Sequence, residues 1–574
     1  MTADDVVFAV QKSAMIEARG VEDVKADELR STSLIPVVAG ARRGGSDPIG
    51  KLTSVILARI FQFLVDCDHQ QHHRPVTGPQ SPYYCIILAH VCRRWRTVML
   101  LSPQLWRRLV VGDVRMTKMA LKLSEPELLR VTAYIPLMKL ARAKSLSCVL
   151  AETRRMKSLR LTMPGVFLSK VESLYSEPAN ALEELCIFDC DYRLTAGITI
   201  MDGVVRPGLF KGHTPLLRKV HFHRVHFHWA DAIFCPSITH LEVSYRAGWL
   251  SQVGRFDELV KTLAKMPGLQ ELSVEGGIPC LPDDVDELPE DDVMVSLCAL
   301  KRLSLMGDAI DVARFLKNVS LPSVVRVTVD GRYRSSGDHG LQLLMKFFFM
   351  YACGSRDPIQ SVTVRPVAES KYVFYGWRQA IQPSEVETSH DISLRISGEP
   401  DGTAFQTFVD ECPVFPQVVS LNIEASASGW ELPTLVKQMP SLKRLAVTGN
   451  LLSPDYPTLV SRWIRQEDIE AAFSCGSLET VHLESVRLGC AHPGHPLVFL
   501  DGVVSGLRLR MKRGMPMLKL LSLEECSNGT STDIGQLREV AEVVKWDGYE
   551  NIEFEDPYFD SDDDSELSDD ENEV

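Results

Sequence analysis

The feature that most constrains the fold of this chain is a short apolar template that recurs through most of its length. Each copy has apolar residues at i, i+3 and i+5, and the middle positions of successive copies lie 21 to 40 residues apart. Strand side chains alternate between faces, so the last two positions share a face and each copy predicts a strand buried on one side. The copies are Met156/Leu159/Leu161, Leu182/Leu185/Ile187, Leu217/Val220/Phe222, Ile238/Leu241/Val243, Leu269/Leu272/Val274, Leu300/Leu303/Leu305, Val324/Val327/Val329, Ile359/Val362/Val364, Val418/Leu421/Ile423, Leu442/Leu445/Val447, Leu478/Val481/Leu483 and Leu518/Leu521/Leu523, with a weaker copy at Leu394/Ile396.

Amphipathic helices precede several copies. The set Phe256, Leu259, Val260 and Leu263 has the i, i+3, i+4, i+7 spacing of one helix face, and similar sets start at Val312 and Leu432. A helix, a loop and a short strand repeated in this way indicate stacked units. We therefore expect an α/β fold in which residues 125–545 form an irregular leucine-rich-repeat solenoid, or horseshoe. A compact α/β domain with apolar strands is the alternative.

The segment before the repeats has a different, helical texture. Residues 1–45 are expected to be a flexible lead-in, and residues 46–110 a domain of three helices. The stretch LTSVILARIFQFLV predicts a mostly buried first helix. A second helix is expected from Tyr83 to Leu100, and Ser102-Pro103 should begin a short third helix, with the hydroxyl as its cap. The apolar stripe of the second helix consists of Ile87, Val91, Trp95 and Val98.

This helical segment resembles an F-box over about 60 residues. The residues that carry the resemblance are Ile49 and Leu52 at its start, RIFQFL with Ile60, Phe61 and Leu64, VCRRWR from Val91 to Arg96, and QLW with Leu105 and Trp106. Thr53 stands where the family usually has proline, and Val55 where it often has glutamate. The order of F-box, irregular repeats and acidic tail is similar to a layout common among fungal F-box proteins.

The resemblance implies a function without bond chemistry. An F-box docks a Skp-type adaptor, which links it to a cullin-RING ubiquitin ligase (the SCF type), while the downstream domain holds the substrate protein. Cys92, Trp95 and Trp106 are expected to form a small apolar cluster that closes the three helices. The expected adaptor-binding residues are Ile49, Leu52, Ile56, Ile60, Phe61, Leu64, Val91, Cys92, Trp95, Leu105 and Trp106.

Substrate is expected on the strand face that points away from the core. The residue between the second and third template positions lies on that face. These residues are Arg160, Cys186, His221, Glu242, Ser273, Ser304, Thr328, Thr363, Arg395, Asn422, Ala446, His482 and Ser522. Recognition is expected to involve the bulkier side chains of this row together with His223, so the candidate substrate-binding residues are Arg160, His221, His223, Glu242, Arg395 and His482. A merely solvated sheet face is the alternative.

Charge and cysteine content limit the class of protein. The net charge is −13, and residues 553–574 contain 12 acidic and no basic residues, which leaves −1 for the rest. This tail is expected to be disordered. No charge bias points to nucleic acid or a membrane surface as partner. The 14 cysteines are scattered, and we see neither a signal peptide nor an apolar run long enough to span a membrane. We expect an intracellular protein, cytoplasmic, nuclear or both.

No motif for catalysis or for a cofactor is recognised, so we expect a protein that is not an enzyme and has no cofactor or metal. The histidines of HFHRVHFHW (His221, His223, His226 and His228) are expected to be polar surface residues, and Cys490, His492 and His495 are a weak zinc signal. Three other functions stay open. They are a repeat scaffold without ligase coupling, which Thr53 keeps open, an acidic-tailed binder of basic nuclear proteins, and a metalloenzyme.

Overall fold

The computed structural model describes most of the chain between Leu52 and Gly548. The described stretches are 52–70, 84–136, 140–190, 205–245, 254–281, 294–322, 325–332, 340–353, 358–368, 371–380, 390–397, 414–425, 435–449, 476–486, 498–527 and 529–548, together with a few single residues. The predicted lead-in, the acidic tail, Ile49 and the zinc signal at Cys490 lie outside them. The chain divides into two compact units, which are residues 1–280 with 293–300 and residues 281–292 with 301–574.

Unit 1 begins with a helical module, defined here as residues 52–106. It contains α2 (Ser54–Gln70), α3 (Tyr84–Val91), α4 (Arg93–Leu100) and the 3-10 turn η2 (Pro103–Leu105). The single helix expected from Tyr83 to Leu100 is therefore wrong. Cys92 interrupts it with an extended backbone (φ −159°, ψ 168°), and its sulfur accepts a hydrogen bond from the Trp95 amide at 3.4 Å, so that α4 starts with a new cap.

The third helix is short, as expected, and is a single 3-10 turn without a side-chain cap. Pro103 occupies its first position as predicted, but the Ser102 hydroxyl donates to the Val98 carbonyl oxygen at 2.6 Å. The expected hydroxyl cap is thus wrong, because the hydroxyl is used by the end of α4, whose last carbonyl groups have no partner within the helix.

The strands of unit 1 form a parallel sheet in chain order. They are β1 (Arg108–Val110), β2 (Leu129–Tyr134), β3 (Met156–Met163), β4 (Glu184–Asp189), β5 (Lys219–His223), β6 (His240–Ser244) and β7 (Glu271–Glu275). The middle template residues Leu159, Leu185, Val220, Leu241 and Leu272 are mutual neighbours in this register. All template residues of these strands are at most 1% exposed, so the predicted inward face is confirmed.

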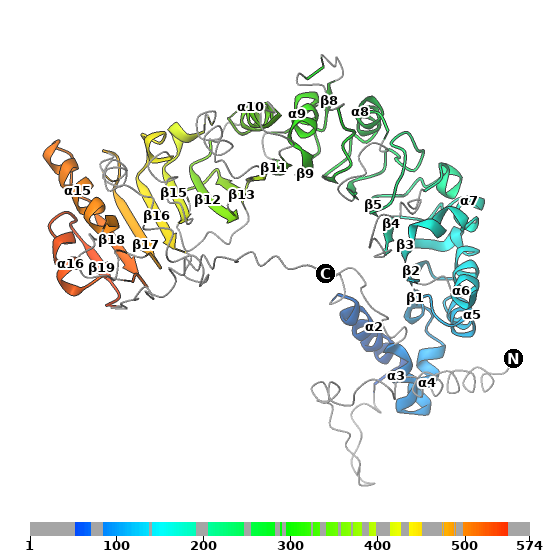
Figure 1. The fold of residues 1–574 in the computed structure, drawn as a ribbon. Coiled ribbons are helices and arrows are strands. Elements are labelled where there is room, and N and C mark those ends of the chain that lie inside the picture. Colours follow the sequence, from blue (N-terminus) through cyan, green and yellow to red (C-terminus); the bar gives the residue numbers. More distant parts are fainter. Residues whose placement is uncertain are drawn as a thin grey trace, which may run out of the picture. The chain divides into compact units, whose positions relative to one another are not determined.

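Helices cover one side of this sheet. They are α5 (Val114–Leu123), α6 (Leu140–Leu150), α7 (Ser173–Ser176) and α8 (Phe256–Ala264), accompanied by the short turns η3 (Thr153–Arg155), η4 (Gly165–Lys170) and η5 (Leu209–Gly212). In Figure 1 the four helices lie on the same side of the strands of their unit. Strand β1 pairs with β2, so the sheet begins within the segment that the sequence assigned to the helical domain.

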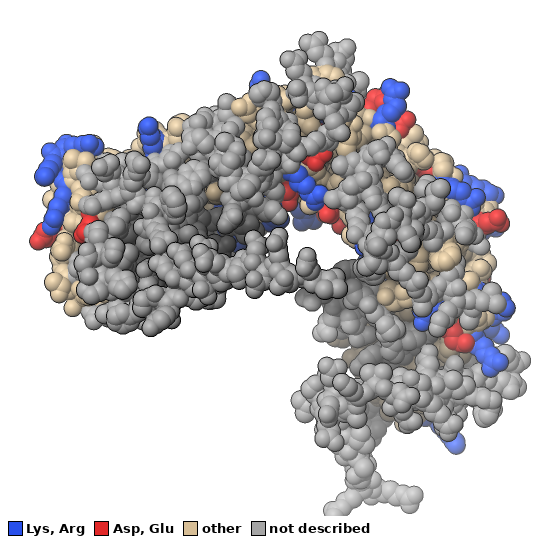
Figure 2. Space-filling view, in the orientation of Figure 1, with Lys and Arg blue, Asp and Glu red and all other residues tan. Residues whose placement is uncertain are grey.

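Unit 2 repeats this arrangement with one departure from chain order. Its elements are β9 (Arg302–Asp308), α9 (Ala309–Asn318), β11 (Arg326–Arg332), α10 (Gly340–Cys353), β12 (Ser361–Ala368), β13 (Lys371–Trp377), β14 (Ile392–Ser397), η8 (Phe415–Gln417), β15 (Ser420–Ala425), β16 (Arg444–Gly449), β17 (Thr480–Glu484), α15 (Val498–Lys512), β18 (Leu520–Glu524), α16 (Ser531–Leu537) and β19 (Val544–Trp546). Figure 2 shows charged side chains of both signs on the surface, with basic ones gathered over α15.

The departure is a reversed group of three strands. Strand β11 pairs in parallel with β14 and not with β12, while β12 pairs in parallel with β15. Strand β13 lies antiparallel between β12 and β14. The sequence template did not predict β13, because this strand runs against the repeat direction. The remaining pairs of the unit are parallel and in phase.

The template describes unit 2 well, with a change of register at β14. Leu394 and Ile396 are both buried, as the weak copy predicted, but Ile392 and Leu394 are the residues that pair with Val327 and Val329. The pairing of β14 with β11 is therefore displaced by two residues from the template. Each unit is an α/β structure with mostly parallel strands, which is consistent with a repeat solenoid. Among the residues that the structure describes, no helix combines the length and apolar character that a membrane crossing requires.

Substitution of Gly449, the last residue of β16, tests how closely this strand packs against the segment that follows β17. A Cβ atom on Gly449 would overlap the carbonyl oxygen of Ser485, which is main chain and cannot rotate away. Gly449→Ala is expected to lower the stability of unit 2 by about 1–3 kcal/mol, read as a lower denaturant midpoint. The control is Gly535→Ala in α16, where nothing lies within 4 Å of the added atom. Equal midpoints for the two variants would contradict the register of β16.

Candidate functional site

Exposed apolar side chains are concentrated on the helical module. Of the 14 large hydrophobic side chains that are exposed in the described residues, eight lie between Val55 and Leu101. Such a concentration on a small segment marks a binding surface, because scattered single exposed residues are the usual pattern. The eight are Val55, Ile56, Ile60, Phe63, Leu64, Ile87, Val91 and Leu101.

The first helix is therefore not mostly buried as the sequence suggested. Its buried face consists of Leu57, Ala58 and Phe61, which are at most 8% exposed. Other apolar residues of the same stretch lie on the remaining faces, and Val55 and Phe63 are 79% and 68% exposed. The predicted stripe of the second helix also divides at Cys92, since Ile87 and Val91 are exposed while Val98 is buried.

The module has a small core of its own. Phe61 is fully buried, and its ring lies 4.8 Å from the Trp95 ring, measured between centroids. Leu105 and Trp106 are 2% exposed, and the Trp106 indole Nε1–H donates to the Met99 carbonyl oxygen at 2.9 Å. Cys92 is exposed at the start of α4, so the expected cluster of Cys92 with the two tryptophans is wrong.

The predicted adaptor-binding residues thus fall into two groups. Ile56, Ile60, Leu64, Val91 and Cys92 are exposed, and Leu52 and Trp95 are half-buried. Phe61, Leu105 and Trp106 belong to the core and can support a docking surface only indirectly. Ile49 lies outside the described residues.

The basic cluster of the module has a structural use. Arg94 donates to the Leu52 carbonyl oxygen, which ties α4 to the start of α2, and the Arg96 Nε–H donates to the Ala89 carbonyl oxygen at 3.1 Å, which ties α4 to α3. Thr53 begins α2, because its hydroxyl oxygen accepts from the Ile56 amide at 3.3 Å and its carbonyl oxygen from the Leu57 amide at 3.0 Å. These contacts fix the orientation of the exposed side chains of α2.

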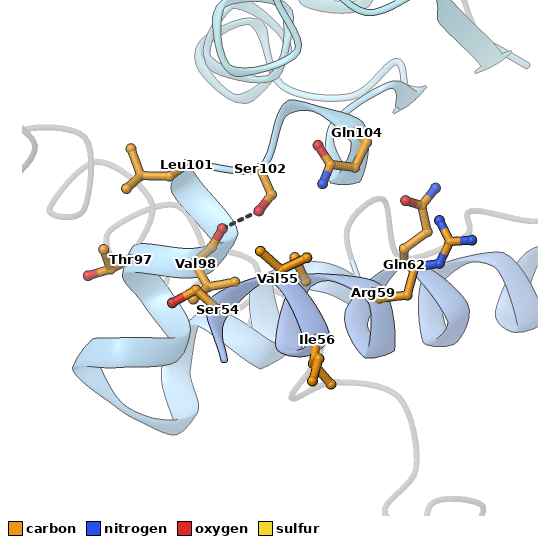
Figure 3. Close-up of a pocket in the computed structure, with 11 residues that line it drawn as sticks. Ser54, Val55, Ile56, Arg59, Gln62, Thr97, Val98, Leu101, Ser102 and Gln104 are labelled. Atoms are coloured by element: carbon orange, nitrogen blue, oxygen red, sulfur yellow. Dashed lines mark hydrogen bonds between the residues drawn. The ribbon is translucent and has the colours of Figure 1, made fainter. Parts of the chain in front are cut away.

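A groove runs along one edge of α2. It has a volume of about 650 Å³ and is lined by both apolar and polar residues. In Figure 3, the side chains of Val55 and Ile56 point to different sides of α2, so the helix presents apolar groups on two sides. The sequence did not predict the groove, although the apolar residues of α2 lie all around its helical wheel. The lining residues are Ser54, Val55, Ile56, Ala58, Arg59, Gln62, Thr97, Val98, Leu101, Ser102 and Gln104.

The second candidate region is the helix-free strand face of unit 1. His221 Nδ1 lies 2.8 Å from Glu242 Oε2, and this hydrogen bond lowers the pKa of Glu242 below its usual value. His223 Nδ1 lies 2.6 Å from the Ser244 hydroxyl, and burial together with nearby Arg224 lowers the pKa of His223. Arg160 contacts Glu184 at 3.6 Å. The structure thus joins His221 with Glu242 and places His223 on the same strand as His221, whereas Arg160 lies two strands away from His221, on β3.

The two candidates in unit 2 are less closely grouped. His482 lies 3.8 Å from Glu484 and 4.0 Å from Glu524. Arg395 pairs with Asp330 at 3.5 Å and lies two residues beyond the predicted row, in which Ser393 is the residue of β14. The row of outward residues is otherwise in register, but its small members Cys186, Thr363, Ala446 and Ser522 are buried.

No protein-family model matches this chain, and a search of curated proteins finds no match.

Histidine and cysteine chemistry is limited in the described residues. His226 is 4% exposed and packs against the Tyr245 ring at 5.6 Å, so its prediction as a surface residue is wrong. Burial raises the pKa of the Cys186 thiol to about 12 and that of Cys526 to about 11, so both are protonated near neutral pH. A thiol in this state is a poor nucleophile.

Proposed function

We propose that this chain is a non-catalytic receptor, an F-box subunit of a Skp-cullin-RING ubiquitin ligase. In this proposal the helical module docks a Skp-type adaptor, and the repeat units hold a substrate protein. The observation that carries it is the concentration of exposed apolar side chains on α2 and α3 above a small tryptophan-centred core. Three short helices bury little surface, and a partner that covers those side chains would stabilise the module.

Docking would use the side of α2 that carries Ile56, Ile60 and Leu64, together with Ile87 and Val91 of α3. These five side chains are 41–58% exposed. An apolar helix face of this kind fits a helical partner. Thr53, at the position where the family usually has proline, caps α2 and so supports the same helix start by a different contact. This favours adaptor docking over a repeat scaffold without ligase coupling.

Co-purification tests this function. The full chain is expected to retrieve a Skp-type adaptor from cells, and purified adaptor is expected to bind it with a one-to-one stoichiometry. The repeat region is expected to retrieve substrate when ligase turnover is blocked. If purified adaptors of this type show no binding, the ligase function is wrong and the scaffold alternative replaces it.

Substrate capture is expected to depend on the pair His221 and Glu242. The double variant His221→Ala, Glu242→Lys removes their 2.8 Å contact and reverses an exposed charge on the strand face. We expect substrate capture to fall about tenfold, or about 1.4 kcal/mol, because a few residues carry most of the binding free energy of an interface and this pair is expected to be among them. Quantitative mass spectrometry of captured proteins measures it.

The control for this variant is adaptor binding, which is expected to stay unchanged because the module is a separate segment. A second control reverses Glu172 to lysine, an exposed acid at the start of α7 on the helix side of the sheet. Unchanged substrate capture by the double variant would place recognition elsewhere on the chain.

A further inference from the structure

The helix-free strand face of unit 1 has a basic end. On this face, β1 contributes Arg108 and Val110, β2 contributes Arg130, Thr132 and Tyr134, and β3 contributes Ser158, Arg160 and Thr162. Three of these are arginines and none is an acid. Arg130 is exposed, and Arg108 and Arg160 are half-buried.

The opposite end of the same face is acidic. There, β6 contributes His240, Glu242 and Ser244, and β7 contributes Glu271, Ser273 and Glu275. Three of these are glutamates and none is lysine or arginine. Glu242 is exposed, and Glu271 and Glu275 are half-buried. The parallel register places both ends on one continuous face, because Arg160, Cys186, His221, Glu242 and Ser273 are successive neighbours.

The middle of the face carries no net charge of its own. Strands β4 and β5 contribute one acid, Glu184, and one base, Lys219. Phe188 and His223 add flat side chains whose rings lie 5.7 Å apart. Because burial lowers the pKa of His223, its ring adds no charge near neutral pH. The face therefore changes from basic to acidic across its strands, with an aromatic part between.

The strand spacing sets the length of a matching ligand. Neighbouring strands lie about 4.8 Å apart, so β3 and β6, the inner edges of the basic and acidic ends, are separated by about 14 Å. An extended peptide covers about 3.3 Å per residue, so about four residues span this distance. A peptide that crosses the strands meets the arginines at one end and the glutamates at the other.

We propose that this face binds an extended segment of a substrate protein that carries both an acidic and a basic block. The acidic block lies over β1–β3 and the basic block over β6–β7. About four residues separate the two blocks. Electrostatic complementarity of this kind fixes the register of the ligand and rejects segments of a single sign. The inference names the substrate class within the proposed function, but it does not depend on adaptor docking.

The test uses fluorescent peptides and the full-length chain. The matching probe has four glutamates, four Gly/Ser residues and four lysines. The comparison probes are the same blocks joined by one residue, an all-glutamate peptide and an all-lysine peptide. Wild-type protein is expected to bind the matching probe at least about tenfold more tightly than each comparison, and this preference should weaken as salt screens the charges.

Two charge-reversal variants complete the test. Glu242→Lys with Glu271→Lys is expected to lose the matching probe and to gain the all-glutamate peptide. The control, Glu125→Lys with Glu172→Lys, has the same change in net charge, but both positions lie outside the strands of this face. It is expected to keep the wild-type preference.

Two outcomes overturn the inference. The first is equal binding of the matching and one-residue probes to wild-type protein, and the second is an unchanged preference in the Glu242/Glu271 variant. Failure of adaptor binding with an intact peptide preference would overturn the proposed ligase function alone, so the two failures are distinguishable.

Discussion

Replacing Ile60 and Leu64 by glutamate is expected to abolish adaptor capture by this chain. Both side chains lie on the apolar side of α2, with 41% and 47% exposure, so the folded module tolerates the change. Each buried contact at the centre of an interface typically contributes about 2 kcal/mol. The double variant should therefore lose about 4 kcal/mol of binding free energy, roughly a thousandfold in Kd. Titration calorimetry with purified adaptor measures it.

A matched control separates docking from general surface damage. Leu128 and Val543 are 43% and 48% exposed and lie outside the module. Leu128→Glu with Val543→Glu is expected to bind the adaptor like wild-type protein. Phe61 is unsuitable for this test because it is fully buried against Trp95, and its loss would unfold the module. Equal affinity of the two double variants would contradict docking through α2.

Trp106→Ala is expected to unfold the helical module while the strands remain folded. Trp106 is 2% exposed, and removing such a large buried side chain costs about 3–5 kcal/mol. The change also takes away the indole donor of the Met99 carbonyl oxygen. A segment of three short helices has little stability to lose. Limited proteolysis should then cut within residues 52–106 and leave the repeat region resistant.

Trp106→Phe is the companion variant. It keeps most of the apolar packing and loses only the hydrogen bond, which typically contributes about 1 kcal/mol. We expect this variant to remain protease-resistant and to bind the adaptor. If Trp106→Ala is as resistant as wild-type protein, the tryptophan core does not hold the module together.

The sequence by itself determined the strands and their inward faces. Alternation along a strand is a local property with a period of two, so the spacing of Leu185 and Ile187, or of Leu445 and Val447, was enough to predict which side chains are buried. The outward position of His221 and Glu242 followed from the same alternation. A helix start is also encoded locally, by its capping residue and a proline at its first position. The Ser102 hydroxyl, however, donates to the Val98 carbonyl oxygen of the preceding helix and does not cap the third helix.

Only the tertiary structure decided which elements lie side by side. The reversed strand β13 and the shifted position of Arg395 depend on pairing between distant segments, which no local period encodes. The buried face of α2 was equally undetermined, because apolar residues surround the helix and only contact with Trp95 and its neighbours selects Leu57, Ala58 and Phe61. The change from basic to acidic across the strand face of unit 1 exists only after parallel pairing has placed Arg130 and Glu271 on one surface, because the two residues are far apart in the sequence.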